Sequence, residues 1–158
     1  YIPLLKEKQP QATVVLIQTK AYRVPNIKGS KDLGDFDEYT EKLTQGIKLY
    51  KEKLDEHLGH NKALIAPVGL AFSELHKTNQ ELWKKLYFLD NFHPSPYGSL
   101  LQAFVVFWTI TGEAPPTYNM DWWNEAKSIF YSSKFPNEQD GQLLYDAAMK
   151  VCKSTSQE

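Results

Sequence analysis

The sequence is poor in cysteine and has no excess of charge of one sign. Its single cysteine, Cys152, cannot close an internal disulfide, and no zinc-ligand spacing surrounds it, so the fold does not depend on an oxidising compartment and no metal site is predicted. With 18 basic and 19 acidic residues, the formal net charge is −1. This balance gives no indication of a nucleic-acid partner.

Long apolar runs and glycine-rich phosphate loops are also missing. The longest apolar run, residues 100–110, is shorter than the ~20 residues that cross a bilayer, and it includes Gln102 and Thr109. No transmembrane segment is therefore predicted. Because no nucleotide-binding fingerprint is present, no cofactor is predicted either. The sequence does not assign a cellular compartment.

The sequence does contain enough apolar residues to form the core of a folded domain. The 158 residues are 42% hydrophobic and 13% aromatic. The β-branched run 13–17 and the run 63–68 are typical of strands covered on both faces. Between them, apolar residues recur at helical spacing over 39–54. Strand, helix and strand in this order predict a βαβ unit with parallel pairing.

The rest of the chain is mostly helical by the same criteria. We expect one or two helices over 70–86 and a buried helix over 97–111, with Ser95 as its N-cap and Pro96 at its first position. Two amphipathic helices are expected over 120–132 and 138–153. Residues 1–11 are expected to be irregular, and 20–37 to form a long surface loop.

Two strands are too few for a parallel sheet that helices cover on both faces. We therefore interpret 1–158 as a single but incomplete α/β domain, with a strand-and-helix portion over 11–117 and a C-terminal helical extension over 118–153. Because the first residue is Tyr1 rather than Met, we expect a further segment upstream. The predicted partner is that N-terminal half, or a companion chain that completes the sheet.

The residues with the clearest chemical potential are Asp90 and His93, in Asp-Asn-Phe-His-Pro. A histidine that acts as a general base needs its ring held in one tautomer, and a carboxylate bonded to one ring nitrogen does this. The Asp-x-x-His spacing lets one tight turn bring both groups together. A buried helix directly after the turn gives it a rigid support.

This block resembles the last conserved block of the SGNH, or GDSL, hydrolase superfamily, whose members are α/β enzymes with a small parallel, flavodoxin-like sheet. Residues 14–19 look like a late strand of the family and 66–69 like the next one, and the resemblance covers roughly residues 12–117. It implies that His93 is the base and Asp90 its orienting acid. By the same resemblance, Gln18 and Thr19, after a strand's C-terminal end, would line the substrate pocket.

The family's nucleophilic serine and oxyanion donors belong to earlier blocks that have no counterpart here. Ser30 follows the first matched strand, and Ser95 and Ser99 look like cap and helix residues. One hypothesis is therefore a C-terminal portion of an ester hydrolase, acting on a carbohydrate or acyl ester, whose serine lies upstream or in another chain. The alternative is a catalytically inactive structural or binding subunit, with the 20–37 loop, the C-terminal helices and the Trp122–Trp123 pair as contacts.

Three histidines outside this block carry a simpler interpretation. His57 and His60 flank Gly59 at a predicted helix end, and His76 ends another predicted helix. Cationic side chains are favoured at helix C-termini, so these histidines are predicted to have a structural role at the helix ends.

Overall fold

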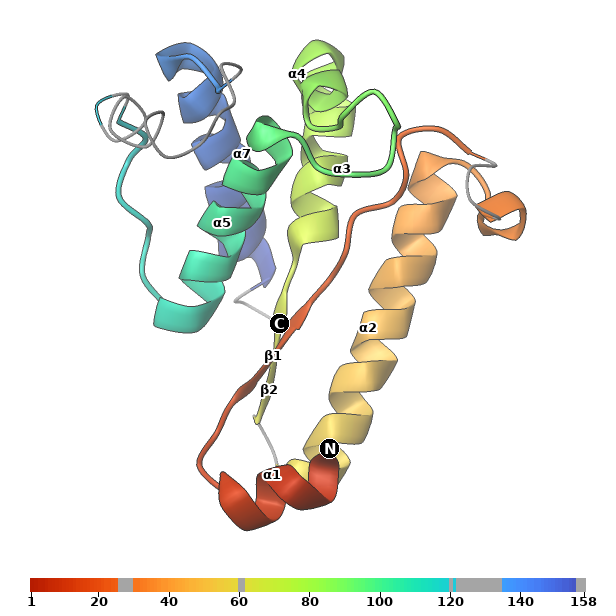
Figure 1. Ribbon diagram of the computed structural model, residues 1–158, viewed down its shortest axis with the longest axis vertical. Helices are drawn as coiled ribbons and strands as arrows, with labels where there is room; N and C mark the ends of the chain where they lie inside the picture. The colour runs from red at the N-terminus through yellow and green to blue at the C-terminus, as the bar shows by residue number, and fades with distance from the viewer. Residues whose placement is uncertain (26–29, 60–61, 120, 122–134, 156–158) are drawn as a thin grey trace.

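The computed structural model describes residues 1–25, 30–59, 62–119, 121 and 135–155 (Figure 1). Within them the chain forms a two-stranded parallel sheet with helices around it, which confirms the predicted mixed α/β class. The elements in order are α1 (Ile2–Lys8), β1 (Val14–Ile17), the 3-10 helix η1 (Ser30–Leu33), α2 (Phe36–Leu58), β2 (Ala63–Ala66), α3 (Val68–Thr78), α4 (Gln80–Lys85), α5 (Pro96–Thr111) and α7 (Glu138–Thr155).

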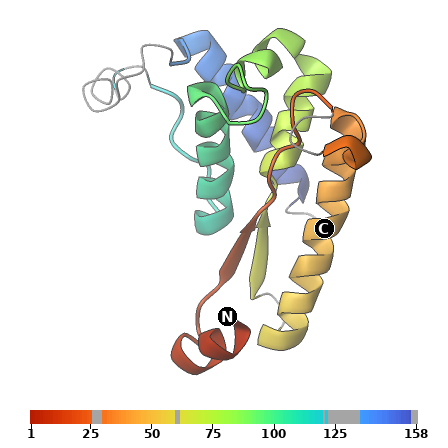
Figure 2. The ribbon, with the colours of Figure 1, turned by 45° about the vertical axis from the view of Figure 1, so that its right-hand side comes forward.

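The predicted βαβ unit is confirmed. β1 and β2 pair in parallel, from Val14 opposite Ala63 to Ile17 opposite Ala66, and α2 connects them. Figures 1 and 2 show α2 on one side of the strands and α5 with α7 on the other. Within the described residues, no further strand pairs with this sheet.

The two outer edges of the sheet differ. The Asp55 carboxylate on α2 accepts a hydrogen bond from the Ala63 N–H at 2.9 Å, so it occupies part of the β2 edge. On the β1 side, the Val14 N–H donates to the carbonyl of Lys62, the residue before β2. The Gln18 N–H, just after β1, donates to the Ala66 carbonyl in β2. Because backbone groups alternate along a strand, the N–H groups of Val15 and Ile17 point away from β2. A further strand that joined the sheet beside β1 would pair with these groups.

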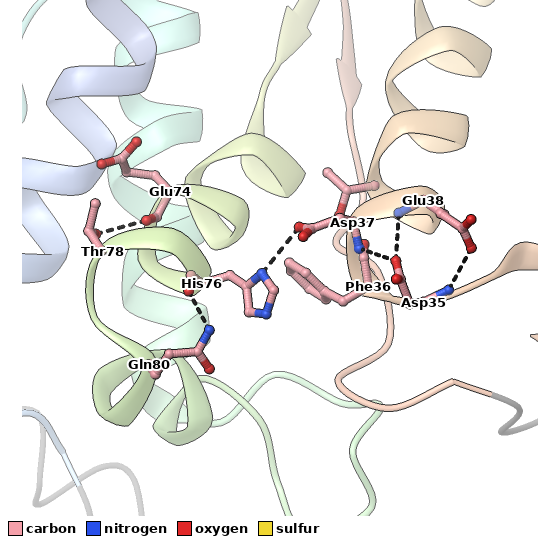
Figure 3. Close-up of polar contacts among 9 residues, drawn as sticks. Asp35, Phe36, Asp37, Glu38, Glu74, His76, Thr78 and Gln80 are labelled. Carbon is pink, nitrogen blue, oxygen red and sulfur yellow. Dashed lines mark hydrogen bonds and ion pairs between the residues drawn. The ribbon is translucent and has the colours of Figure 1, made fainter.

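Helix α2 begins at Phe36 rather than near Tyr39, because a capping box defines its start. The N–H groups of Asp37 and Glu38 donate to the Asp35 carboxylate at 3.0 and 2.9 Å, and the Glu38 carboxylate accepts the Asp35 N–H at 3.1 Å (Figure 3).

The expectation of an irregular N-terminus was wrong, because residues 2–8 form α1. Pro3 lies in its first turn, where a missing N–H costs no hydrogen bond. Of the one or two helices expected over 70–86, the structure has two, α3 and α4, which meet at Asn79.

The core lies where α3, α4, α5 and α7 meet, and its largest fully buried side chains include Phe72, Leu82, Leu101 and Leu144. The predicted burial of the helix after Ser95 holds as far as Val105, and no later residue of α5 is buried. Phe107 is 40% exposed and Ile110 64% exposed, so the C-terminal end of α5 presents apolar side chains to solvent. The helix predicted over 120–132 lies outside the described residues except for Asp121.

Candidate functional site

Asp90 and His93 lie in a tight turn between α4 and α5. Tyr87 and Pro94 form an antiparallel bridge at the base of the turn. Inside it, the Phe88 N–H donates to the His93 carbonyl, and the Asn91 N–H donates to the Phe88 carbonyl, each at 3.0 Å. These backbone bonds close the turn and fix the backbone that carries the Asp90 and His93 side chains.

The two side chains form the pair that the Asp-x-x-His spacing predicts. His93 Nδ1 is 2.6 Å from Asp90 Oδ2, while Asp90 Oδ1 accepts the N–H groups of Phe92 and His93 at 2.9 and 3.0 Å. The bond from His93, supported by these backbone N–H groups, holds the pKa of the Asp90 carboxyl well below its usual range. With Nδ1 bonded to the carboxylate, Nε2 is the ring nitrogen left for proton transfer.

Arg23 braces the turn from a distant part of the chain. Its Nε donates to the Asn91 Oδ1 at 2.6 Å, its Nη1 to the Lys84 carbonyl at 3.1 Å, and its backbone N–H to the Asn91 carbonyl at 3.0 Å. Asn91 has a positive φ of 60°, a conformation that asparagine tolerates better than most residues. Sequence reasoning did not identify Arg23, because no local pattern links it to a turn so far along the chain.

A partly apolar wall lies beside the histidine. The Phe92 ring is 4.5 Å from the His93 ring and 4.8 Å from the Tyr22 ring, and Lys20 Nζ lies 5.3 Å from the Phe92 ring centre. Burial lowers the pKa of Lys20, and the negative charge of Asp90 opposes this shift. Residues 20–22, in the predicted surface loop, therefore form one side of the candidate site.

Gln18 and Thr19 are placed differently from each other. The Gln18 side chain is buried and donates from Nε2 to Thr44 Oγ1 on α2 at 2.7 Å; among the described residues, no hydrogen bond joins it to Asp90 or His93. The Thr19 side chain is exposed. A Cβ on Gly69 would lie 2.6 Å from the Thr19 carbonyl oxygen, so glycine lets α3 begin close to the end of β1.

The hydroxyl group nearest in sequence, that of Ser95, already has a structural role. Ser95 is buried, caps α5 by accepting the N–H groups of Tyr97 and Gly98, and donates to the Lys85 carbonyl. Burial raises the pKa of the Cys152 thiol to about 11, which keeps it protonated. Across the described part of the chain, no hydroxyl or thiol is hydrogen-bonded to His93.

The described residues contain no group of three or more His, Cys, Asp or Glu side chains arranged to hold a metal ion. None of their helices is long and apolar enough to cross a membrane.

A second Asp–His pair joins α3 to α2. His76 Nδ1 lies 3.1 Å from Asp37 Oδ1 (Figure 3), and the His76 ring packs between Phe36 and Trp83, with ring centres 4.4 and 4.5 Å away. His76 does lie in the last turn of α3, as its interpretation as a helix-end residue requires. No sequence pattern indicated the contact between His76 and Asp37.

Some sequence predictions concern residues outside the described ones. His57 lies in the last turn of α2, but His60 is outside the described residues. The Trp122–Trp123 pair, predicted as a contact surface, also lies outside them.

Comparison of this chain with known protein families, with curated proteins and with solved structures finds no match.

Proposed function

We propose that this chain is the C-terminal portion of an SGNH-type ester hydrolase and supplies the Asp and His of a Ser-His-Asp triad. The observation that carries this proposal is the 2.6 Å bond between Asp90 and His93 Nδ1, in a turn that Arg23 and the backbone hold rigid. Such an arrangement fixes the tautomer that a general base requires. The substrate class is a carbohydrate or acyl ester.

The incomplete sheet supports a companion segment or chain as the source of the nucleophile. The β1 edge has backbone groups that point away from β2, and Ile17 at its end is 47% exposed. An added parallel strand would cover this edge and bring its own C-terminal end to the side of the sheet from which Gln18 and Thr19 emerge. Ligands of open α/β sheets bind outside these strand ends.

The chemistry follows from the geometry. His93 Nε2 takes the proton from the serine hydroxyl of the companion segment as its oxygen attacks the ester carbonyl carbon. Asp90 stabilises the imidazolium that forms, and His93 then returns the proton to the departing alcohol. Water hydrolyses the acyl-serine by the same route. The Phe92 and Tyr22 rings provide an apolar contact for the group next to the reacting carbonyl.

The test uses the chain isolated together with whatever protein co-purifies with it. Hydrolysis of p-nitrophenyl acetate is measured, and a fluorophosphonate probe labels any activated serine. Substitution of the base, His93→Ala, is expected to reduce turnover by about 10³-fold or more. The matched control is His76→Ala, because His76 is also bonded to an aspartate but packs against α2 instead of lying in the turn. This control is expected to keep its activity.

Two results would count against the proposal. Unchanged turnover in His93→Ala would remove His93 from the catalytic role. If the isolated assembly neither hydrolyses the ester nor takes up the probe, the chain is instead a catalytically inactive subunit that has kept the Asp–His turn.

A further inference from the structure

Lys20 is a cation in the wall beside His93, at the end of the sheet where ligands are expected. It lies just past the C-terminal end of β1, and ligands of open α/β sheets bind outside such strand ends. Its Nζ is 5.3 Å from the Phe92 ring centre, and the Phe92 ring centre is 4.5 Å from that of His93. Lys20 and His93 therefore contact the same aromatic side chain.

The Lys20 ammonium group has no anionic partner in the described part of the chain. The negative charge of Asp90 acts on it from beyond ion-pair distance, and no hydrogen bond or ion pair joins Nζ to another described residue. Asp90 itself is bonded to His93. The two lysines at the base of the turn differ from Lys20, because Lys84 is paired with Glu81 at 2.7 Å and Lys85 with Asp140 at 2.9 Å.

Lys20 Nζ can be reached by a ligand. The buried side-chain polar atoms that lack a hydrogen-bond partner, among the described residues, are Gln18 Oε1 and Trp83 Nε1. Lys20 Nζ also lacks such a partner and is not one of these buried atoms, so it keeps contact with solvent. The rest of the side chain is partly buried, and this burial lowers the Lys20 pKa. A partly desolvated cation attracts an anion more strongly than a fully hydrated one does.

We propose that Lys20 binds an anionic group on the substrate, so that the preferred ester carries a negative charge on its alcohol part, as an ester of an acidic sugar does. In a carbohydrate ester, the alcohol part contains a ring of about the width of the Phe92 ring. One side of such a ring can lie at His93 while the other side reaches Lys20. The inference names the substrate class of the proposed hydrolase and rests on that proposed function.

The test compares two acetyl esters, 4-acetoxybenzoate and 4-acetoxybenzamide. They have nearly the same shape, but only the first carries a charge, on the side of the ring opposite the ester. The kcat/KM of each is measured from the absorbance of the released phenol, with the protein isolated together with any co-purifying chain. The ratio of benzoate to benzamide is expected to be about tenfold lower in Lys20→Met than in the unaltered protein, because a charge-assisted contact is lost. Comparing ratios cancels the different reactivities of the two esters.

Two variants serve as controls. Lys20→Arg keeps the charge and is expected to keep most of the preference for the benzoate. Lys84→Met removes the same charge close to the turn, from a side chain that is paired with Glu81, and leaves the Lys84 carbonyl in place. It should keep the ratio of the unaltered protein. If Lys20 only supports the Phe92 ring, its loss would change the turnover of both esters equally and leave the ratio unchanged. Lys20→Gln replaces Lys20→Met if the latter does not fold.

The anion site is also measured without hydrolysis, by ligand-observed NMR with 4-methoxybenzoate and 4-methoxybenzamide, which contain no ester. Lys20→Met is expected to bind the benzoate about tenfold more weakly than the unaltered protein does. An unchanged kcat/KM ratio in Lys20→Met would overturn the inference, and so would an equal fall of the ratio in Lys84→Met. If neither ester is hydrolysed, the hydrolase proposal fails, and the NMR comparison alone decides on the anion site: equal binding of 4-methoxybenzoate by the unaltered protein and Lys20→Met would overturn it too.

Discussion

Three donors converge on the Asp90 carboxylate, yet the pair they hold is open to solvent. The side chains of Asp90 and His93 are 43% and 59% exposed. Exposed ion pairs add little to stability, with a median of about 0–1 kcal/mol. The short bond therefore matters chiefly for the direction of the His93 ring, and the bracing by Arg23 matters for the same reason.

The Asp90 carboxyl is expected to titrate at lower pH than an ordinary aspartate, for which the pKa is about 3.9. Because folding lowers this pKa, the ionised carboxylate stabilises the folded state fully above the pKa of the unfolded chain, about 3.9. This contribution is lost as the pH falls toward the lower pKa of the folded protein. His93→Ala removes the main cause, so the ¹³C NMR titration midpoint of Asp90 should rise. The midpoint of Asp55, lowered chiefly by Lys51, should stay unchanged. An unmoved Asp90 midpoint in the variant would contradict this explanation.

At this scale, local spacing made the Asp90–His93 contact predictable, because a single turn joins the two residues. The contacts of Arg23 and Tyr22 with the same turn were not predictable, since they depend on how a distant loop folds back. The resemblance that suggested Gln18 as a pocket residue gave only its place at the end of β1. The side chain's direction, toward Thr44, is set by α2 packing against the sheet.

Helix α5 positions the turn, and its ends follow from residues that the sequence makes visible. Ser95 caps the first turn, Pro96 lies at its first position, and Gly112 ends the helix with a φ of 71°. Gly98 is less obvious: a Cβ there would lie 2.3 Å from the Leu86 carbonyl oxygen, in the backbone that leads into the turn. The close approach of helix and turn therefore requires glycine at this position.

Gly98→Ala is expected to destabilise the protein by about 2 kcal/mol, because the helix has to move away from Leu86. The matched control is Gly46→Ala in α2, where nothing lies within 4 Å of an added Cβ. This control should stabilise by about 0.5–1 kcal/mol, since alanine is the better helix former. Urea unfolding of both variants measures the difference. Equal effects of the two substitutions would show that α5 does not need the close contact.

Helical spacing predicted α2, α5 and α7 correctly, but it did not predict the true start of α2. The Asp35-x-x-Glu38 capping box was present in the sequence, at the end of the 20–37 segment, whose two glycines and one proline favour a loop. The exposure of Phe107 and Ile110 was unpredictable for a different reason. An apolar helix indicates burial somewhere, but the sequence does not show whether this chain or another supplies the cover.

On the scale of the whole molecule, the hydrogen-bonding groups at the two edges of the sheet bear on where a further strand can pair. Asp55 occupies a backbone donor on the β2 edge, whereas the β1 edge has outward-pointing N–H groups at Val15 and Ile17. The exposed apolar end of α5 and the 47% exposed Ile17 are what an incomplete domain would leave uncovered. The proposed companion strand therefore belongs beside β1.

Ile17→Pro tests this placement directly. Proline removes the outward N–H of residue 17 but leaves the donors of the β1–β2 hydrogen bonds, which by the alternation along the strand are residues 14, 16 and 18. The matched control, Ile17→Ala, loses most of the same side chain but keeps the N–H. If a companion strand pairs with β1, a pull-down with Ile17→Pro should retain about one tenth of the companion that Ile17→Ala retains, or less. The reason is that proline affects both the backbone hydrogen bond and the strand geometry at residue 17. Equal retention by the two variants would place the proposed companion at another surface, and the serine proposed for the triad would then have to reach His93 from there.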